Sequence, residues 1–397
     1  MKKLFNVLVL VLVAVLTLSL TACGGGKEEP FKVGLICLHD ESSTYDKNFI
    51  DSMYRAIDEL GLEETQLELV TGIGENEACY QKASELAQTC DIVFADSFGH
   101  EDFMIQAAKE NEDVWFCHST GTKAHTKNLE NYFNAFASIY EGRYLAGIVA
   151  GMKLNEMINN NEITAEEAVI GYVGAFPYAE VVSGYTSFYL GAKSVCPTAT
   201  MKVRYTSSWY DYDKEKAAAE ALVNTDACVL ISQHADSYGA PEACEKLGVP
   251  NVAYNGSTAS KCPETYLVAS KIDWTPYYVK MIQAKMEGKE VSEKDYTGTL
   301  STASVKLDVL GKNVAEGTQE ALDAAIEGLN NGTIHVFDTD NFTVNGQKLE
   351  SYLADVDDFG DFVPETEVIS EGYFHESEYR SAPYFDIRID GITEINE

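Results

Sequence analysis

The sequence is short of cationic side chains. Its 397 residues include 29 Lys and Arg against 63 Asp and Glu, so the formal net charge at pH 7 is −34. Nucleic acids and anionic bilayer surfaces repel so acidic a protein, and we expect neither to be a partner. A small neutral ligand is compatible with this charge.

Several short motifs that mark enzymes are also absent. No Gly-x-Gly-x-x-Gly follows the first predicted strands, because the segment Gly72–Glu77 lacks the last glycine, so a dinucleotide site is unsupported. The chain has no Gly-x-Ser-x-Gly elbow, no His-Glu-x-x-His pair and no phosphate-binding loop. We therefore expect neither an enzymatic activity nor a cofactor.

The first 30 residues combine a basic start, an apolar run over residues 4–20 and a cysteine, which is the shape of a secretory signal. Leu20-Thr21-Ala22-Cys23 resembles the bacterial lipobox, where the chain is cut before a cysteine whose sulfur then carries the lipid. The resemblance implies a signal peptide over 1–22, lipidation of Cys23 and a flexible tether over 23–30. The protein would then be anchored by its lipid on the outer face of the bacterial cell membrane. An uncleaved signal anchor is the alternative.

Cysteine spacing gives no metal-binding pattern. The sequence has no Cys-x-x-Cys and no His pair at helical spacing near a cysteine, so we expect no metal site. An even number of cysteines follows Cys23, which permits disulfides in an exported protein. Single buried thiols are the other reading, because Cys37, Cys117 and Cys228 lie inside apolar strand-like runs.

From residue 31 onward, short apolar runs rich in β-branched residues alternate with stretches of helical periodicity. This alternation predicts an α/β fold with parallel sheets and crossover helices. It restarts near Ile170, so we expect two doubly wound lobes joined by a hinge, over 31–150 and 151–300. Residues 301–370 are expected to return to the first lobe with a helix and a hairpin that turns near Asn345. Residues 371–397 form an acidic, Tyr-rich C-terminal extension.

Five segments resemble, in order, the basic membrane protein family of Med/PnrA-like lipoproteins. They are Tyr140–Gly147, Ile170–Gly174, Gly184–Lys193, Trp209–Lys214 and Gly332–Phe337. The resemblance implies a fold like that of type I periplasmic binding proteins. It also implies a substrate-binding lipoprotein of an ABC importer, with a permease and an ATPase as partners and a purine as ligand. We expect a monomer.

Departures from the family pattern concern the ligand. Residues 208–211 and 233–237 resemble a subgroup associated with free nucleobases such as adenine, and Asn255 stands near a position where nucleoside binders often carry an acid. We therefore expect a purine, either a nucleobase or a nucleoside, and the departures favour the free base. Two other functions stay open, a receptor that presents its ligand to a membrane signalling protein and an importer receptor for a non-purine molecule.

Aromatic side chains are the first candidates for binding a flat purine ring. Trp209 lies just past a predicted strand, where ligands of such sheets bind, and it matches the stacking aromatic of the family. Tyr45 and Phe49 are the counterparts on the first lobe. Phe49 could equally be a core residue of its helix, and Trp209 could be a core residue at a strand end.

Polar candidates lie at strand ends and helix starts. Carboxylates that could accept from ring N–H groups are Glu141, Asp211, Asp236 and Asp273. Residues that could donate and accept, or line the floor of the cleft, are Ser97, Gln233, His234 and Asn255. Each Asp has an alternative role as a helix cap.

Overall fold

The computed structural model describes residues 30–356 and 363–395. The predicted signal peptide, Cys23 and all of the tether but its last residue therefore lie outside the described residues. Among the described residues, no helix has both the length and the hydrophobicity to cross a membrane.

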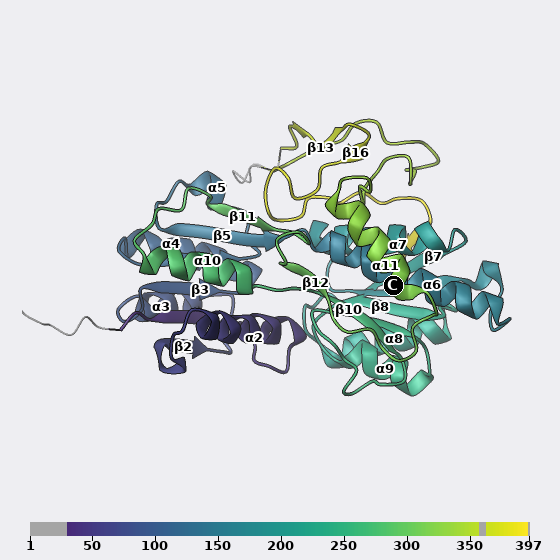
Figure 1. Cartoon of the computed structure of the whole chain (residues 1–397), viewed down its shortest axis with the longest axis horizontal. Coiled ribbons are helices and arrows are strands. Elements are labelled where there is room, and N and C mark those ends of the chain that lie inside the picture. The colour runs from purple at the N-terminus through teal and green to yellow at the C-terminus, as the bar shows by residue number, and fades with distance from the viewer. Residues whose placement is uncertain (1–29, 357–362, 396–397) are drawn as a thin grey trace, which may run out of the picture. The chain divides into compact units, whose positions relative to one another are not determined.

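Two mainly parallel sheets organise residues 32–395 (Figure 1). The first has the strand order β11-β5-β4-β3-β1-β2, and all its pairings are parallel. Its strands are β1 (Val33–Ile36), β2 (Leu67–Val70), β3 (Ile92–Ala95), β4 (Trp115–Ser119), β5 (Tyr132–Ala137) and β11 (Asp295–Gly298). Its helices are α2 (Thr44–Glu59), α3 (Glu77–Leu86), α4 (Glu101–Glu110), α5 (Ala124–Lys127) and α10 (Thr275–Met286). We call this part the first lobe.

The second sheet has the strand order β12-β10-β9-β8-β6-β7-β17, in which only the pairing of β12 with β10 is antiparallel. Its strands are β6 (Val169–Gly174), β7 (Thr200–Tyr205), β8 (Leu230–His234), β9 (Asn251–Tyr254), β10 (Tyr266–Ile272), β12 (Val305–Leu307) and β17 (Ile392–Glu394). Its helices are α6 (Ile139–Asn159), α7 (Ala179–Val195), α8 (Tyr212–Asn224), α9 (Gly239–Leu247) and α11 (Thr318–Asn330). We call this part the second lobe.

The central strands are buried from end to end, as expected for parallel sheets covered by helices on both faces. On one face of the second sheet, α6 and α7 approach very closely. A Cβ atom added to Gly147 would lie 2.0 Å from the Phe188 carbonyl oxygen, and one added to Gly191 would lie 2.0 Å from the Tyr144 carbonyl oxygen. The close approach explains why a small residue is needed at Gly147 of α6 and at Gly191 of α7.

The lobes divide the chain differently from the sequence-based prediction. Helix α10 and strand β11 belong to the first lobe, since α10 packs on α2 and β11 pairs with β5. Helix α6 belongs to the second lobe, so the first crossing comes at Ser138 and not near residue 150. Alternation along the chain indicates the type of each element, but it does not say which sheet the element joins.

The segment after residue 301 packs on the second lobe, which corrects the expectation that it returns to the first. Helix α11 packs against α6, and the side chains of Phe337 and Phe385 are buried in the same hydrophobic cluster as α6 and α7. The C-terminal extension ends in β17, which pairs with β7. Figure 1 shows the part of this segment that follows α11, in yellow-green and yellow, beside α7 and α11.

The hairpin predicted in this segment was wrong except for its turn. Asn345 and Gly346 have φ values of 52° and 76°, and a single bridge pairs Val344 with Gln347. The remaining strands of the segment are two residues long. They are β13 (Leu353–Ala354), β14 (Thr366–Glu367), β15 (Ile369–Ser370) and β16 (Tyr373–Phe374). The eight cysteines that follow Cys23 are buried free thiols.

Candidate functional site

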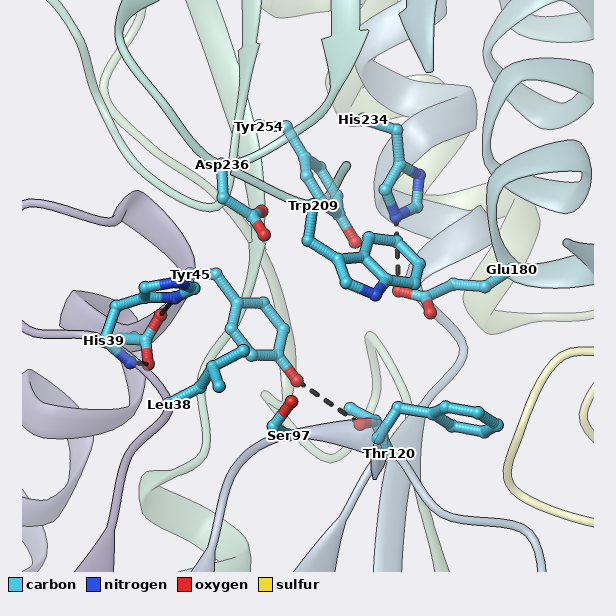
Figure 2. A pocket seen from close by; sticks show the side chains of 12 residues that line it. Leu38, His39, Tyr45, Ser97, Thr120, Glu180, Trp209, His234, Asp236 and Tyr254 are labelled. Carbon is cyan, nitrogen blue, oxygen red and sulfur yellow. Dashed lines mark hydrogen bonds and ion pairs between the residues drawn. The ribbon is translucent and has the colours of Figure 1, made fainter. Parts of the chain in front are cut away.

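A pocket lies between the two lobes, and its empty space, which includes open solvent at its mouth, amounts to about 420 Å³. Its residues sit at or after the carboxyl ends of strands in both sheets, and at the starts of α2 and α7, which is where doubly wound sheets bind ligands. Figure 2 shows most of them. The first lobe contributes Leu38, His39, Tyr45, Asp46, Ser97, Phe98 and Thr120, and the second lobe contributes Glu180, Trp209, His234, Asp236 and Tyr254.

Tyr45 forms part of the first-lobe wall, as the sequence predicted. It stands in the first turn of α2, a helix that begins where the Ser43 side chain accepts from the Asp46 backbone N–H. Its hydroxyl donates to the carbonyl oxygen of Asp96 at 2.6 Å, which fixes the ring in place. Burial raises the pKa of this phenol well above its ordinary value, so Tyr45 acts as a neutral ring.

Beneath Tyr45 lies a buried acidic cluster, in which ligand atoms of Cys37, Asp46 and Asp96 lie within 4.8 Å of one another. Burial, followed by the Asp46 charge, raises the pKa of Asp96 well above its ordinary value. Burial would also raise the pKa of Asp46, but hydrogen bonds from His39 and Ser43 outweigh it and lower that pKa. The raised pKa of Asp96 beside the lowered pKa of Asp46 favours one proton shared within the cluster.

Ser97 also lines the pocket as predicted, but its hydroxyl is already engaged. It donates to Glu75 Oε1 at 2.6 Å. Asp46 accepts from the backbone N–H of His39 at 2.7 Å. The polar groups of the first-lobe wall are thus mostly occupied by partners within that lobe.

Trp209 forms part of the opposite wall, again as the sequence predicted. It follows β7 and is half-buried, and its ring makes a T-shaped contact with Phe176 at a centroid distance of 5.2 Å. Tyr178 lies beside it at 6.1 Å. The indole is therefore held by two neighbouring rings and also borders the pocket.

Asp236 presents a buried carboxyl to the pocket. Its Oδ1 accepts from the Asn255 amide at 3.3 Å, and its backbone carbonyl accepts from the N–H of Thr44 in the first lobe at 2.9 Å. Its Oδ2 has no partner within the described ranges. Burial, then the charges of Glu215 and Asp46, raises the pKa of Asp236 well above its ordinary value. Asn255 itself does not line the pocket and acts on it through Asp236.

His234, Glu180 and Tyr254 form the rest of the second-lobe wall. His234 Nε2 lies 3.2 Å from Glu180 Oε1, and its ring packs on Tyr254 at 4.2 Å. Burial lowers the pKa of His234, although the carboxylate of Glu180 opposes this shift. A neutral imidazole therefore donates from Nε2 to Glu180. The Tyr254 hydroxyl has no hydrogen-bond partner in the part of the chain that the structure describes.

Two predicted site residues face away from the pocket. Phe49 is fully buried and stacks on Trp274 at 4.4 Å, so it is the core residue that the alternative reading allowed. Gln233 precedes His234 in β8 and therefore points to the other face of the sheet. Its side-chain oxygen accepts from the Asn251 amide at 2.9 Å.

Two further predicted residues have structural partners. Asp211 caps α8, accepting from the Lys214 backbone N–H at 3.0 Å. Glu141 accepts from the Leu300 backbone N–H at 2.7 Å, and burial raises its pKa to about 7. The contact ties α6 to the segment that joins β11 and β12. Neither residue lines the pocket.

Asp273 lies at another crossing between the lobes and not in the pocket. Its Oδ1 accepts from Arg55 of α2 at 3.1 Å and its Oδ2 from Lys306 of β12 at 2.7 Å. It also accepts from the Thr275 backbone N–H at the start of α10. Asp273 is thus a buried tie between elements of both lobes.

Sequence reasoning missed several pocket residues, most importantly Glu180 and Tyr254. Glu180 resembles an ordinary acidic residue in the first turn of a helix, and Tyr254 resembles a buried strand residue. Tyr254, however, ends β9, and Glu180 stands in the first turn of the helix that follows β6, and these positions are the signal that could have found them. The others are Leu38, His39 and Thr120.

The comparisons with known proteins bear on this geometry. A family model described as ABC transporter substrate-binding protein, PnrA-like, matches residues 33–336. The chain belongs to this family. The PnrA-like chain is therefore a substrate-binding protein and not an enzyme, and such proteins act outside the cytoplasm with the permease and ATPase of an importer.

Two curated relatives differ in the ligand that their names give. A purine-binding protein of Brucella abortus is 30% identical over 83% of this chain and 94% of its own length. A Haloferax volcanii protein, named as a candidate glucose-binding protein of an ABC transporter, is 34% identical over 62% of this chain and 59% of its own length. The family is thus settled, whereas the ligand of this PnrA-like chain is a separate question.

The solved structures confirm the expected fold. An ABC transporter solute-binding protein from Conexibacter woesei superposes with a TM-score of 0.62 at 19% identity, over 77% of this chain and 98% of its own. This likeness shows the two-lobed, type I periplasmic-binding-protein architecture. The match of the family model ends before most of the C-terminal segment that covers the second lobe.

Proposed function

We propose that the protein captures a purine, and a free base in preference to its nucleoside, for delivery to an ABC importer. The observation that carries this proposal is the pocket itself. Aromatic rings from both lobes border it, and two carboxyl groups of one lobe face it with unoccupied oxygens.

The aromatic pair fits a flat ring. Tyr45 comes from the first lobe and Trp209 from the second, so a planar ligand between them would touch both lobes (Figure 2). Stacking of a base on one aromatic side chain contributes about 1–3 kcal/mol in single-strand binding proteins. A ligand held in this way favours closed lobes.

The polar groups fit a ligand that donates hydrogen bonds. Glu180 and Asp236 offer oxygens, and a protonated Asp236 can also donate to a ring nitrogen. Among the described residues that line the pocket, none is a Lys or an Arg. Phosphorylated ligands such as nucleotides are therefore disfavoured.

The preference for a base now rests on different residues from those the sequence suggested. Of the four carboxylates first considered, Glu141, Asp211 and Asp273 are engaged elsewhere, and only Asp236 remains. Glu180 takes their place. A free base carries an N–H where a nucleoside carries its sugar. A buried acceptor that loses such a partner costs about 1–3 kcal/mol, so ribose should weaken binding about tenfold or more.

Glucose is the second candidate, because it appears in the name of one relative. A sugar has hydroxyl groups around its entire edge and needs a polar partner for most of them. The first-lobe wall offers few, since Tyr45, Ser97 and Asp46 already have partners within the lobe. This wall therefore favours a purine over a sugar.

Calorimetry on protein freed of bound ligand by unfolding and refolding tests the proposal. Adenine, guanine, adenosine and glucose would be titrated into residues 31–397. We expect binding of at least one base, about tenfold or more tighter than of its nucleoside, and no heat from glucose. Equal affinity for base and nucleoside would remove the preference for a base. Binding of glucose alone would reject the purine.

The lipid anchor is a separate part of the proposal. It rests on Leu20-Thr21-Ala22-Cys23, which lies outside the described residues. Metabolic labelling with a fatty acid should mark the wild type and not Cys23→Ser, which should accumulate as precursor. Label that persists in the variant would reject lipidation at Cys23.

A further inference from the structure

Arg143 of α6 is fully buried behind the second-lobe wall of the pocket. Its guanidinium donates to side chains or carbonyls on four neighbouring strands. The acceptors are Tyr172 Oη at 3.2 Å, Ser232 Oγ at 2.7 Å, the Ala253 carbonyl at 3.4 Å and Ser270 Oγ at 3.1 Å. One cation thus joins β6, β8, β9 and β10 from a single helix.

None of these acceptors carries a charge. Within residues 30–356 and 363–395, no carboxylate lies within 4.0 Å of the Arg143 guanidinium, and its Nε has no partner. An arginine keeps its proton in proteins, and a buried charge is costly unless an opposite charge lies near. The charge of Arg143 must therefore be balanced at longer range.

The contacts of Arg143 lead towards the pocket. Three aromatic rings surround the guanidinium carbon, with centroids at 4.8 Å for Phe188, 5.3 Å for Tyr254 and 5.5 Å for Tyr172. Tyr254 also belongs to the pocket wall and packs on His234. His234 in turn contacts Glu180. Two neutral rings thus separate the buried cation from a carboxylate that faces the pocket.

The protonation state of the His234 imidazole decides whether the charges of Arg143 and Glu180 balance each other. The charged and titratable groups around the imidazole are Arg143 from α6, Glu180 from α7, Tyr172 from β6, Tyr254 from β9 and Asp236 after β8. Burial lowers the pKa of His234, Glu180 opposes the shift, and Arg143 lowers the pKa further. With the imidazole neutral, Arg143 is the positive charge that faces Glu180 across the wall.

We propose that Arg143 is a positioning residue that sets the charge class of the ligand. Its buried guanidinium balances Glu180 through Tyr254 and His234, so that the pocket takes up neutral flat molecules in preference to cationic ones. Without this charge, a pocket walled by carboxyl groups would attract cations. The inference rests on the proposed function, since it assigns a property of the ligand bound there.

The first test needs no ligand. The imidazole of His234 would be titrated by NMR in the wild type, Arg143→Met and Arg143→Lys. We expect the pKa of His234 to rise by about one unit in Arg143→Met and to stay unchanged in Arg143→Lys, which keeps the charge. Arg204→Met is the matched control, because Arg204 is another cation of the second lobe but pairs with Asp226. If Arg143→Met folds and the pKa of His234 in it equals that of the wild type, the proposal is overturned.

A second measurement applies if the single variant Arg143→Met is too unstable for the titration. Arg143→Met with Glu180→Gln removes both charges, and it should melt at a higher temperature than Arg143→Met. A double variant no more stable than Arg143→Met would contradict the balance between the two residues.

The ligand preference is tested with a matched pair of probes, neutral benzamide and cationic benzamidinium. We expect Arg143→Met to shift the affinity ratio towards benzamidinium about tenfold, while Arg143→Lys keeps the wild-type ratio. An unchanged ratio would overturn the proposal. If neither probe binds, the His234 titration decides. If the wild type binds no purine, the proposed function fails, but the titration still tests Arg143.

Discussion

The two walls of the pocket differ in how fully their polar groups are satisfied. On the first-lobe wall, Tyr45 and Ser97 give their hydroxyl protons to partners within that lobe. On the second-lobe wall, Asp236, Glu180 and Tyr254 keep hydrogen-bonding capacity that faces the pocket. A group without a partner in a buried wall is costly unless a ligand supplies one.

This difference assigns distinct tasks to the two lobes. The second lobe carries the groups that can distinguish one ligand from another by its hydrogen-bonding edge. The first lobe supplies a ring that its own hydrogen bond holds in place, opposite the second-lobe wall. The contact of Thr44 with the Asp236 carbonyl places the two walls together. Selectivity should therefore respond to changes in the second lobe more than to equivalent changes in the first.

The largest effect is expected at Asp236. Asp236→Ala removes the carboxyl that faces the ligand and leaves a buried N–H of the ligand without a partner, which costs about 1–3 kcal/mol. Adenine binding should weaken by about a hundredfold at the upper end of this range, as measured by calorimetry. Ser97→Ala is the first-lobe counterpart and should change affinity little, because its hydroxyl is engaged with Glu75. Equal losses in both variants would contradict the assignment of tasks.

Trp209→Ala should have the next largest effect. It removes a stacking surface that every purine shares, and the loss should be about 1–3 kcal/mol for adenine and guanine alike. Tyr178→Ala is the control, because this exposed ring lies beside Trp209 but does not line the pocket. A change in the order of preference among purines in Trp209→Ala would contradict a purely stacking role.

Incompletely satisfied carboxyl groups also affect stability, and Glu376 of the C-terminal segment shows this most clearly. Burial raises its pKa from 4.5 to about 7, and its Oε1 has no partner among the described residues. The folded protein therefore holds a proton that the unfolded chain releases above about pH 4.5. Its stabilising contribution is complete below that pH and is lost as the pH rises to about 7.

Chemical denaturation at several pH values tests this contribution. Between pH 4.5 and 7, the wild type should lose about 1–3 kcal/mol of unfolding free energy relative to Glu376→Gln. Asp273 should behave in the opposite way, because the hydrogen bond from Lys306 and other partners outweigh burial and lower its pKa. Relative to Asp273→Asn, the wild type should lose stability as the pH falls below about 4. A pH-independent difference for both variants would refute the two assignments.

The smallest effect is expected for Tyr45→Phe. The variant keeps the ring and loses only a hydroxyl that donates to the Asp96 carbonyl. Adenine affinity should fall by less than about fivefold, since a satisfied neutral hydrogen bond contributes about 1 kcal/mol. A loss as large as that of Asp236→Ala would mean that the first lobe also recognises the polar edge of the ligand.

The sequence predicted the elements of this fold better than their assembly. The helices and strands of both lobes alternate along the chain as predicted, because apolar periodicity is a local property. The placement of α10 and β11 in the first lobe depends on pairings between residues far apart in the chain. Nothing in local periodicity specifies such pairings.

The same limit applies to the site. Position at a strand end or at a helix start placed Tyr45, Ser97, Trp209, His234 and Asp236 around the pocket. It failed for Gln233, because neighbouring residues of a strand point to opposite faces and the sequence did not show which face borders the pocket. It failed for Asp211 and Glu141 because backbone N–H groups, which the sequence does not reveal as partners, already occupy their carboxylates.

A crystal structure of the protein with adenine tests the central claim most directly. The account predicts the base between Tyr45 and Trp209, with its N–H groups bonded to Asp236 and Glu180 and without direct hydrogen bonds to first-lobe side chains. A base whose polar edge bonds mainly to the first lobe, or which lies outside this pocket, would contradict it.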